Sequence, residues 1–206
     1  FDTLPIGLWF ADNTGKLVSG NPAGIKIWGA EPKVGIEEYG IFKARKLPEM
    51  TEISPDEWAL AKTIKEGVTI SNELLEIDAF DGKKKIILNY TAPIIDKDTV
   101  LGAIVINEDV TEMKKAEEAI RESENRFRAV LEYSHSAICI INTEGKIVWA
   151  NEALVRIGGY SREEICSAPS FAQFIAPDSI EFVSGNFMKF VSGNDYEHHY
   201  NFYFIR

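Results

Sequence analysis

The sequence lacks several features that would assign it to common protein classes. Its 206 residues include only two cysteines, Cys139 and Cys166, and neither lies in the paired spacing of a zinc site or a redox motif. No apolar run approaches the roughly 20 residues that a membrane-spanning helix needs. The 22 basic residues are outnumbered by 32 acidic ones. We therefore expect a cytoplasmic segment that binds neither nucleic acid nor membrane.

Recognisable catalytic motifs are also missing from the sequence. There is no glycine-rich phosphate loop, no zinc-protease helix motif and no nucleophile elbow. The three histidines, His135, His198 and His199, have no spacing that would bring them together on a metal. An enzyme of unrecognised type is therefore the least supported function. The chain begins with Phe1 rather than Met, and we expect an internal segment of a longer polypeptide.

An internal repeat is the most informative feature of the sequence. Ile6–Ala30 aligns without gaps on Ser136–Tyr160, 130 residues later, with seven identical pairs in 25 positions. Chance would give about one or two identities at average residue usage. Each copy reads as a strand, a tight polar turn ending in glycine, a second strand, and a helix opened by an asparagine, Asn21 or Asn151. The sequence therefore predicts a repeat of fold.

The remainder of the first domain reads as one helix followed by three strands. Ser54 and the proline after it predict a helix that runs to Gly67. Strand-like runs follow at Glu73–Phe80, Lys84–Ile94 and Val100–Val110, joined by short polar turns that suit hairpins. We place this first domain at residues 1–111.

Residues 112–133 form a charged segment free of glycine and proline, with Thr111 positioned to cap a helix. Apolar and small residues recur there at coiled-coil spacing for about three heptads. The seam consists of Met113, Ala116, Ile120, Ser123, Phe127 and Val130. Because Ala116 and Ser123 are small, the seam is weak. We expect a parallel dimeric coiled coil; the alternative is a single helix docked on its own domain.

The junction between the two copies carries a resemblance to a known family. Asp109-Val110-Thr111-Glu112 closes the first domain, and Lys114–Glu118 and Glu124–Arg128 follow it. This order resembles the tandem PAS domains, which are sensory modules, of prokaryotic sensor histidine kinases. The resemblance implies an α+β fold. Each domain would be a five-stranded antiparallel sheet of order 2-1-5-4-3, with short helices over one face and a ligand cavity between.

The second copy, residues 134–206, departs from this family pattern. Tyr196–Ile205 resembles the third strand of the PAS sheet, and no fourth or fifth strand follows it. We therefore predict a truncated second PAS domain whose missing strands a longer natural chain supplies. Within these 206 residues, either the second domain folds differently or another copy of the chain completes its sheet.

The resemblance also bears on cofactors, whose identity the sequence leaves open. Flavin-binding PAS light sensors carry a reactive cysteine in a defined motif, and the residues around Cys166 do not match it. Haem-binding members carry a histidine on the long helix before the third strand. Neither Ser54–Gly67 nor Pro177–Gly193 contains one. We therefore expect neither covalent flavin nor haem.

The two interpretations left for the first domain are a non-covalent small ligand and an empty core. Polar groups that interrupt apolar strands, together with aromatic side chains, are typical of a ligand site. The candidates are Trp28, Trp58, Asn89, Tyr90 and Asn107. Ordinary core packing explains the tryptophans better, and Asn89 could face solvent.

These observations favour a sensory function over catalysis. The first domain would sense a small molecule or a partner and shift the junction at Asp109 and Thr111. The seam residues of a homodimeric linker would then relay the change to an output domain, a histidine kinase outside this chain. The alternative is a ligand-free dimerisation module that spaces and pairs two chains.

Overall fold

The computed structural model describes residues 2–205 and divides the chain into two compact units, Phe1–Ala119 and Ile120–Arg206. The boundary falls inside helix α3 (Thr111–Glu132), in the segment expected to link the domains. Within the described part of the chain, no helix is both long enough and apolar enough to cross a membrane.

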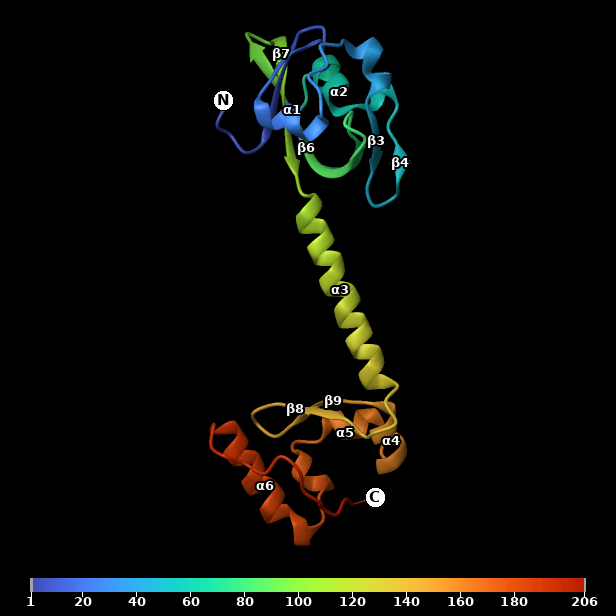
Figure 1. Ribbon diagram of the computed structural model, residues 1–206, viewed down its shortest axis with the longest axis vertical. Helices are drawn as coiled ribbons and strands as arrows, with labels where there is room; N and C mark the ends of the chain where they lie inside the picture. Colours follow the sequence, from blue (N-terminus) through green and yellow to red (C-terminus); the bar gives the residue numbers. More distant parts are fainter. Residues whose placement is uncertain (1, 206) are drawn as a thin grey trace. The chain divides into compact units, whose positions relative to one another are not determined.

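The first unit is built on one antiparallel sheet of seven strands, in the order β2-β1-β7-β6-β5-β3-β4 (Figure 1). The strands are β1 (Gly7–Asp12), β2 (Leu17–Gly20), β3 (Lys43–Lys46), β4 (Thr51–Glu52), β5 (Ile70–Asp78), β6 (Lys84–Asp96) and β7 (Thr99–Asp109). The five expected strands follow the expected order. The expected strand number is wrong, because the hairpin β3–β4 extends the sheet beyond β5.

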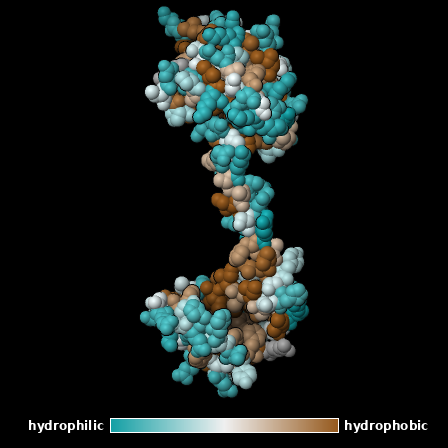
Figure 2. Space-filling view, in the orientation of Figure 1, coloured by the Kyte–Doolittle hydropathy of each residue, from teal (hydrophilic) through white to brown (hydrophobic). Residues whose placement is uncertain are grey.

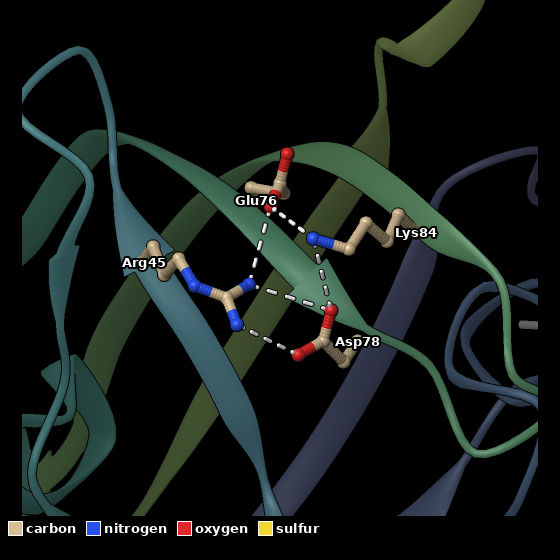
Figure 3. A network of polar contacts seen from close by, with 4 residues as sticks. All are labelled: Arg45, Glu76, Asp78 and Lys84. Carbon is tan, nitrogen blue, oxygen red and sulfur yellow. Dashed lines mark hydrogen bonds and ion pairs between the residues drawn. The ribbon is translucent and has the colours of Figure 1, made fainter.

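A charged network holds the added strand β3 against β5 and β6 (Figure 3). The Arg45 guanidinium lies 3.2 Å from Glu76 and 3.1 Å from Asp78, and Lys84 Nζ lies 3.1 Å from Glu76. All four side chains are partly exposed, so each pair stabilises the fold by at most about 1 kcal/mol. Ala44, between two outward-facing charged residues, is buried and anchors the strand. The network therefore helps to set the register of β3 against β5 and contributes little to the stability of the fold.

Short helices cover the inner face of this sheet. They are α1 (Pro22–Trp28), η1 (Ile36–Ile41), η2 (Pro55–Glu57) and α2 (Ala59–Glu66). The single helix predicted from Ser54 to Gly67 is divided at Trp58, whose ψ of 137° is not helical. Ser54 caps only the short η2, where its backbone N–H donates to Glu57 Oε2 at 3.1 Å. The division turns the Trp58 side chain into the core, where it is 8% exposed.

Aromatic side chains fill the core between the helices and the sheet. The Trp28 and Phe42 rings meet edge to face with centroids 5.1 Å apart, and Phe42 and Trp58 do so at 5.8 Å. Leu75 and Ile77 on β5 are fully buried beneath them. Edge-to-face contacts of this kind add about 0.5–1.5 kcal/mol each beyond the burial of area.

The two copies of the repeat fold alike, as predicted. Asn21 Oδ1 accepts hydrogen bonds from Leu8 N at 2.9 Å and from Gly24 N at 2.8 Å. Asn151 Oδ1 accepts the two equivalent bonds at 2.9 and 3.0 Å. Each asparagine thus caps a helix and ties it to the preceding strand. The glycines of the two turns have φ of 81° and 84°, a conformation that favours glycine.

The second unit contains only one strand pair among its described residues. Its elements are β8 (Cys139–Ile141), β9 (Ile147–Ala150), α4 (Glu152–Gly158), α5 (Arg162–Ser167), η3 (Phe171–Phe174) and α6 (Pro177–Val191). The strand predicted at Tyr196–Ile205 does not form. Its segment makes a single bridge, between Phe204 and Ile175, and Tyr203 O accepts from Ala176 N at 2.9 Å. A strand needs a neighbour that pairs along its length, and residues 120–205 supply none beyond this single bridge.

Helix α3 is continuous over 22 residues, and none of them is buried. Four large seam residues, Met113, Ile120, Phe127 and Val130, are 50–65% exposed. A helix docked on its own domain would have these seam residues covered by that domain. Among the described residues, none covers them to that extent. Thr111 is not the cap that the sequence suggested. It is the first helical residue, and its N–H donates to Asp109 Oδ1 at 3.0 Å.

Candidate functional site

The first unit contains a cavity of about 50 Å³ between the sheet and the covering helices. Its walls are mostly aromatic and apolar, with three polar side chains on β6 and β7. They are formed by Trp9, Leu17, Trp28, Pro32, Tyr39, Phe42, Trp58, Leu60, Asn89, Thr91, Val105 and Asn107. Small-molecule sites usually measure about 300–1,000 Å³. This space therefore accommodates water or a ligand of a few atoms.

A chain of hydrogen bonds runs from the cavity wall across three strands. Trp28 Nε1 donates to Asn107 Oδ1 at 2.9 Å, and Asn107 Nδ2 donates to Asn89 Oδ1 at 2.9 Å. Asn89 Nδ2 donates in turn to Glu73 Oε2 at 3.0 Å. The two asparagines are directly opposed on β6 and β7 and are 4% and 2% exposed. The chain links α1 to β7, β6 and β5 through side chains that are hydrogen-bonded to one another.

Other polar groups of the core divide into paired and unpaired ones. The Thr63 and Thr91 hydroxyls lie 2.6 Å apart and bond to each other. The Tyr39 hydroxyl donates to Gly15 O, and burial together with the nearby Asp12 raises the pKa of Tyr39 well above its usual value. Two lining residues, Trp9 and Trp58, have buried indole N–H groups without a partner among residues 2–205. These donors are available to water or to an acceptor group in the cavity.

The structure brings together four of the five candidate ligand residues of the sequence. Trp28, Trp58, Asn89 and Asn107 line the same cavity, and Asn89 is buried rather than facing solvent. Tyr90 does not line it, because successive strand residues point to opposite faces and Asn89 points inward.

Sequence reasoning missed other members of this site, namely Trp9, Tyr39, Glu73 and Thr91. Strand alternation could have found Thr91, two residues after Asn89. Nothing local marked Tyr39 or Glu73, whose roles depend on contacts with distant parts of the chain.

The lining does not fit the two cofactors best known from PAS domains. It contains no cysteine for a covalent flavin bond and no histidine for haem iron, and its volume is too small for either ring system. Across the described residues, no group of three histidine, cysteine or acidic side chains is arranged to hold a metal ion.

The second unit contains a larger hollow, of about 790 Å³, lined mainly by aromatic and aliphatic side chains. Figure 2 shows hydrophobic residues gathered on the surface of this unit. Phe171, Phe174 and Phe187 contribute from η3 and α6, and Asn186 and His198 are among its few polar residues. Cys139 also lines it, and burial raises the pKa of the Cys139 thiol. The volume falls in the range of small-molecule sites.

The junction of β7 and α3 is bonded firmly to the sheet. Val110, between the two elements, is 4% exposed, and its N–H donates to Ile86 O at 2.9 Å. Ile86 N donates to Thr111 Oγ1 at 2.9 Å. The first residue of α3 is thus attached to β6 as well as to β7. Lys114 N then donates to Val110 O at 2.9 Å and continues the helix from this anchored point.

The last turn of α3 is bonded to the second repeat. Asn151 Nδ2 donates to Leu131 O at 3.0 Å and to Ser136 O at 2.9 Å. Arg162 forms an ion pair with Glu132. Helix α3 therefore ends in contacts with the same asparagine that caps α4.

Comparison with known proteins agrees with this geometry. A family model described as PAS domain matches residues 1–68, and one described as PAS fold matches residues 125–199. The fold is PAS-like. Each match includes one copy of the repeat. Each of the two units has an antiparallel sheet and short helices, as a PAS-like fold does. No curated protein matches the chain significantly.

Several solved PAS structures resemble the chain. The PAS domain of nitrogen regulation protein NR(II) from Vibrio parahaemolyticus is 12% identical, with a TM-score of 0.38, over 52% of this chain and 92% of that one. A PAS domain from Colwellia psychrerythraea is 16% identical, with a TM-score of 0.39, over 54% and 92%. A sensory box histidine kinase/response regulator from Burkholderia thailandensis is 21% identical, with a TM-score of 0.40, over 61% and 92%.

Proposed function

We propose that the chain is a sensory PAS segment that relays the state of its first unit through α3 toward an output domain, a histidine kinase outside these residues. One observation carries the proposal. Trp28 is hydrogen-bonded directly to Asn107 on β7, and β7 continues through Val110 into the anchored first turn of α3. Because each link is a direct hydrogen bond or a covalent connection, we expect a shift at Trp28 to move the start of α3.

The relay requires two states of the first unit that a signal distinguishes. A ligand or partner shifts such an equilibrium only by its difference in affinity for the two states. In the first unit the signal is a partner or a ligand of a few atoms with an acceptor for Trp58 Nε1. The hollow of the second unit, of about 790 Å³, is large enough for a larger apolar ligand.

We further propose that two chains pair in parallel through the α3 seam as a weak coiled coil. The exposed seam of Met113, Ile120, Phe127 and Val130 supports this pairing. We propose that the second unit is an incomplete PAS domain, since it has two strands where the first has seven. The segment would act in the cytoplasm and leave catalysis to other domains.

A screen of small molecules and candidate partners against the chain tests the relay. Tryptophan fluorescence reports changes near Trp28 and Trp58, and hydrogen exchange of residues 111–119 reports changes in α3. We expect any compound that alters the fluorescence by binding the first unit also to change exchange in the first turns of α3. Binding that leaves α3 unchanged would contradict the proposal.

A second function, a ligand-free dimerisation module, is favoured by one observation. The cavity of the first unit is about 50 Å³, and its asparagines are already bonded to each other. If the chain is such a module, it dimerises without any ligand and no compound in the screen alters its tryptophan fluorescence. The same screen therefore separates the two functions.

A further inference from the structure

A row of four residues crosses the inner face of the first sheet. It consists of Gly7 on β1, Asn107 on β7, Asn89 on β6 and Glu73 on β5, each directly opposed to the next. A side chain at Gly7 would meet α1, since its Cβ would lie 2.9 Å from the backbone of that helix. The glycine therefore lets α1 lie close over β1, and Trp28 at the end of α1 reaches Asn107.

A β-bulge in β5 precedes the carboxylate of this row. Ile70 opposes Thr91 on β6. Glu73 follows three positions later but opposes Asn89, only two positions from Thr91. Asn72, inside the bulge, has a φ of 59°, in the left-handed region that residues other than glycine rarely adopt. Regular pairing from Ile70 would put Asn72 opposite Asn89 and turn Glu73 to the outer face. The chain thus accepts an unfavourable backbone conformation where it brings the carboxylate inward.

The two ends of the hydrogen-bond chain permit only one direction of bonding. An ionised carboxylate only accepts and an indole N–H only donates, whereas an amide does both. Glu73 therefore requires Nδ2 of Asn89, and Trp28 requires Oδ1 of Asn107. Both requirements agree with the bonds, in which Asn107 Nδ2 donates to Asn89 Oδ1. Reversal of either amide would set two donors or two acceptors against each other.

The charge of Glu73 also strengthens the bonds beyond it. A hydrogen bond to an ionised group is roughly twice as strong as one between neutral groups, and each bond of a chain polarises the next. Glu73 Oε1 lies 3.8 Å from Lys46 Nζ, beyond hydrogen-bond distance. Glu73 Oε2 lies 3.0 Å from Asn89 Nδ2. Among residues 2–205, the Asn89 amide is therefore the only hydrogen-bond donor to this carboxylate.

We propose that Glu73 is the positioning residue of the first unit's site. Its carboxylate fixes the direction of the two amides and so holds the Trp28 indole against β7. The inference rests on the proposed function, because it names the residue that keeps the first contact of the relay in place. The backbone of Trp28 is held separately, since Trp28 O accepts from Phe80 N at 2.8 Å. Loss of the carboxylate therefore frees the indole without displacing α1.

NMR of the indole N–H groups in the whole 206-residue chain tests this role. Glu73→Met keeps a side chain of similar length and removes the acceptor of Asn89. We expect hydrogen exchange of the Trp28 indole to rise about fivefold or more, the factor that matches the lower end of the cost of an unpaired buried group. Its resonance should move upfield, toward that of Trp58, whose N–H has no partner among the described residues. Exchange of the Phe80 amide should rise less.

Glu73→Gln is the rescue variant, because its Oε1 atom can accept from Asn89 Nδ2. It restores the acceptor without the charge, so its Trp28 indole should lie between wild type and Glu73→Met in both exchange and resonance position. The matched control is Glu108→Met, which replaces an exposed carboxylate of the same sheet and should change neither. Thermal unfolding of each variant establishes that it is folded.

Three results would overturn the inference. The first is a Trp28 indole in Glu73→Met that behaves as in wild type. The second is a rise in Trp28 indole exchange no larger than that of the Phe80 amide, which general loosening of the unit would explain. The third is a glutamine variant no closer to wild type than the methionine variant.

Amide exchange of residues 111–119 in the same variants separates this inference from the proposed function. If Glu73→Met frees the Trp28 indole and leaves α3 unchanged, the inference stands and the relay fails. If Glu73→Met leaves the indole unchanged while Asn107→Leu alters exchange in α3, the inference fails and the relay stands.

Discussion

Asn107 bonds at once to the cavity wall, to β6 and to its own strand. It accepts from Trp28, donates to Asn89 and is 2% exposed. Replacing it with a leucine of similar size leaves the Trp28 indole N–H without an acceptor and the Asn89 Oδ1 atom without its donor. A buried polar group without a partner costs about 1–3 kcal/mol.

We therefore expect Asn107→Leu to lower the free energy of unfolding of the first unit by about 1–3 kcal/mol, measured by urea denaturation. Ser71→Ala, on an exposed position of β5, is the control and should change it by less than about 0.5 kcal/mol. A leucine variant as stable as wild type would mean that the hydrogen-bond chain contributes nothing.

Asp12 gives the first turn a dependence on pH that the second turn lacks. The Thr14 hydroxyl, with the backbone amides of Thr14 and Lys16, lowers the pKa of Asp12. Because the folded pKa is below the unfolded one, this stabilisation is present above the unfolded pKa, about 4, and is lost as the pH falls through the folded pKa. Asn142 makes the equivalent amide bonds and does not titrate.

We expect Asp12→Asn to keep the turn and to remove part of the acid-induced loss of stability of the first unit. The measurement is urea unfolding from pH 7 to pH 3, with NMR titration of the Asp12 carboxyl in the wild type. Thr14→Ala should raise that carboxyl's pKa toward its usual value. An unchanged titration in Thr14→Ala would show that the hydroxyl is not the cause.

At the scale of elements, Thr111 joins α3 to the sheet. Its hydroxyl accepts from Ile86 N, and a valine has the same shape without this group. We expect Thr111→Val to speed amide exchange at Ile86 and Val110 several-fold, corresponding to about 1 kcal/mol. Thr111→Ser retains the hydroxyl and should restore protection. Equal exchange in the valine and serine variants would contradict the role of the hydroxyl.

The sequence was sufficient to predict elements whose signals are local. Alternating apolar residues and glycine turns predicted β1, β2, β5, β6 and β7, and the repeat predicted the same unit twice. The hairpin β3–β4 was missed because Glu31–Glu52 is divided by glycine and proline, and its pairing depends on Arg45 contacts with a distant strand. The strand expected at Tyr196–Ile205 does not form for a related reason: its residues favour a strand, but its only pairing among the described residues is a single bridge to Ile175.

The residues of the candidate site were likewise predictable where local sequence signals mark them, but their contacts with one another were not. Polar residues in apolar strands pointed to Asn89 and Asn107, and the aromatic content pointed to Trp28 and Trp58. Their direct contact depends on the register of β6 against β7, which the turn at residues 96–99 sets and the sequence alone does not specify. Tyr90 could have been separated from Asn89 by strand alternation alone.

At the scale of the whole molecule, two PAS-like units of the same repeat differ in their interiors. The first is closely packed around a cavity of about 50 Å³, and the second has a hollow of about 790 Å³. Helix α3 is hydrogen-bonded at its first residue to the first unit's sheet and at its last turn to Asn151. These bonds attach α3 to both units, as the proposed relay requires.

Hydrogen exchange of α3 in Asn107→Leu tests the central claim most directly. Ile77→Val and Ile77→Ala, which destabilise the same core from β5 by about 0.5–1.5 and 2–5 kcal/mol, bracket the stability loss expected of Asn107→Leu. The relay predicts that exchange of the amides from Lys114 to Ala119 rises about tenfold in Asn107→Leu, beyond the rise in the Ile77 variants. Exchange of these amides in Asn107→Leu no faster than the value interpolated between the two Ile77 variants at its own stability would contradict the relay.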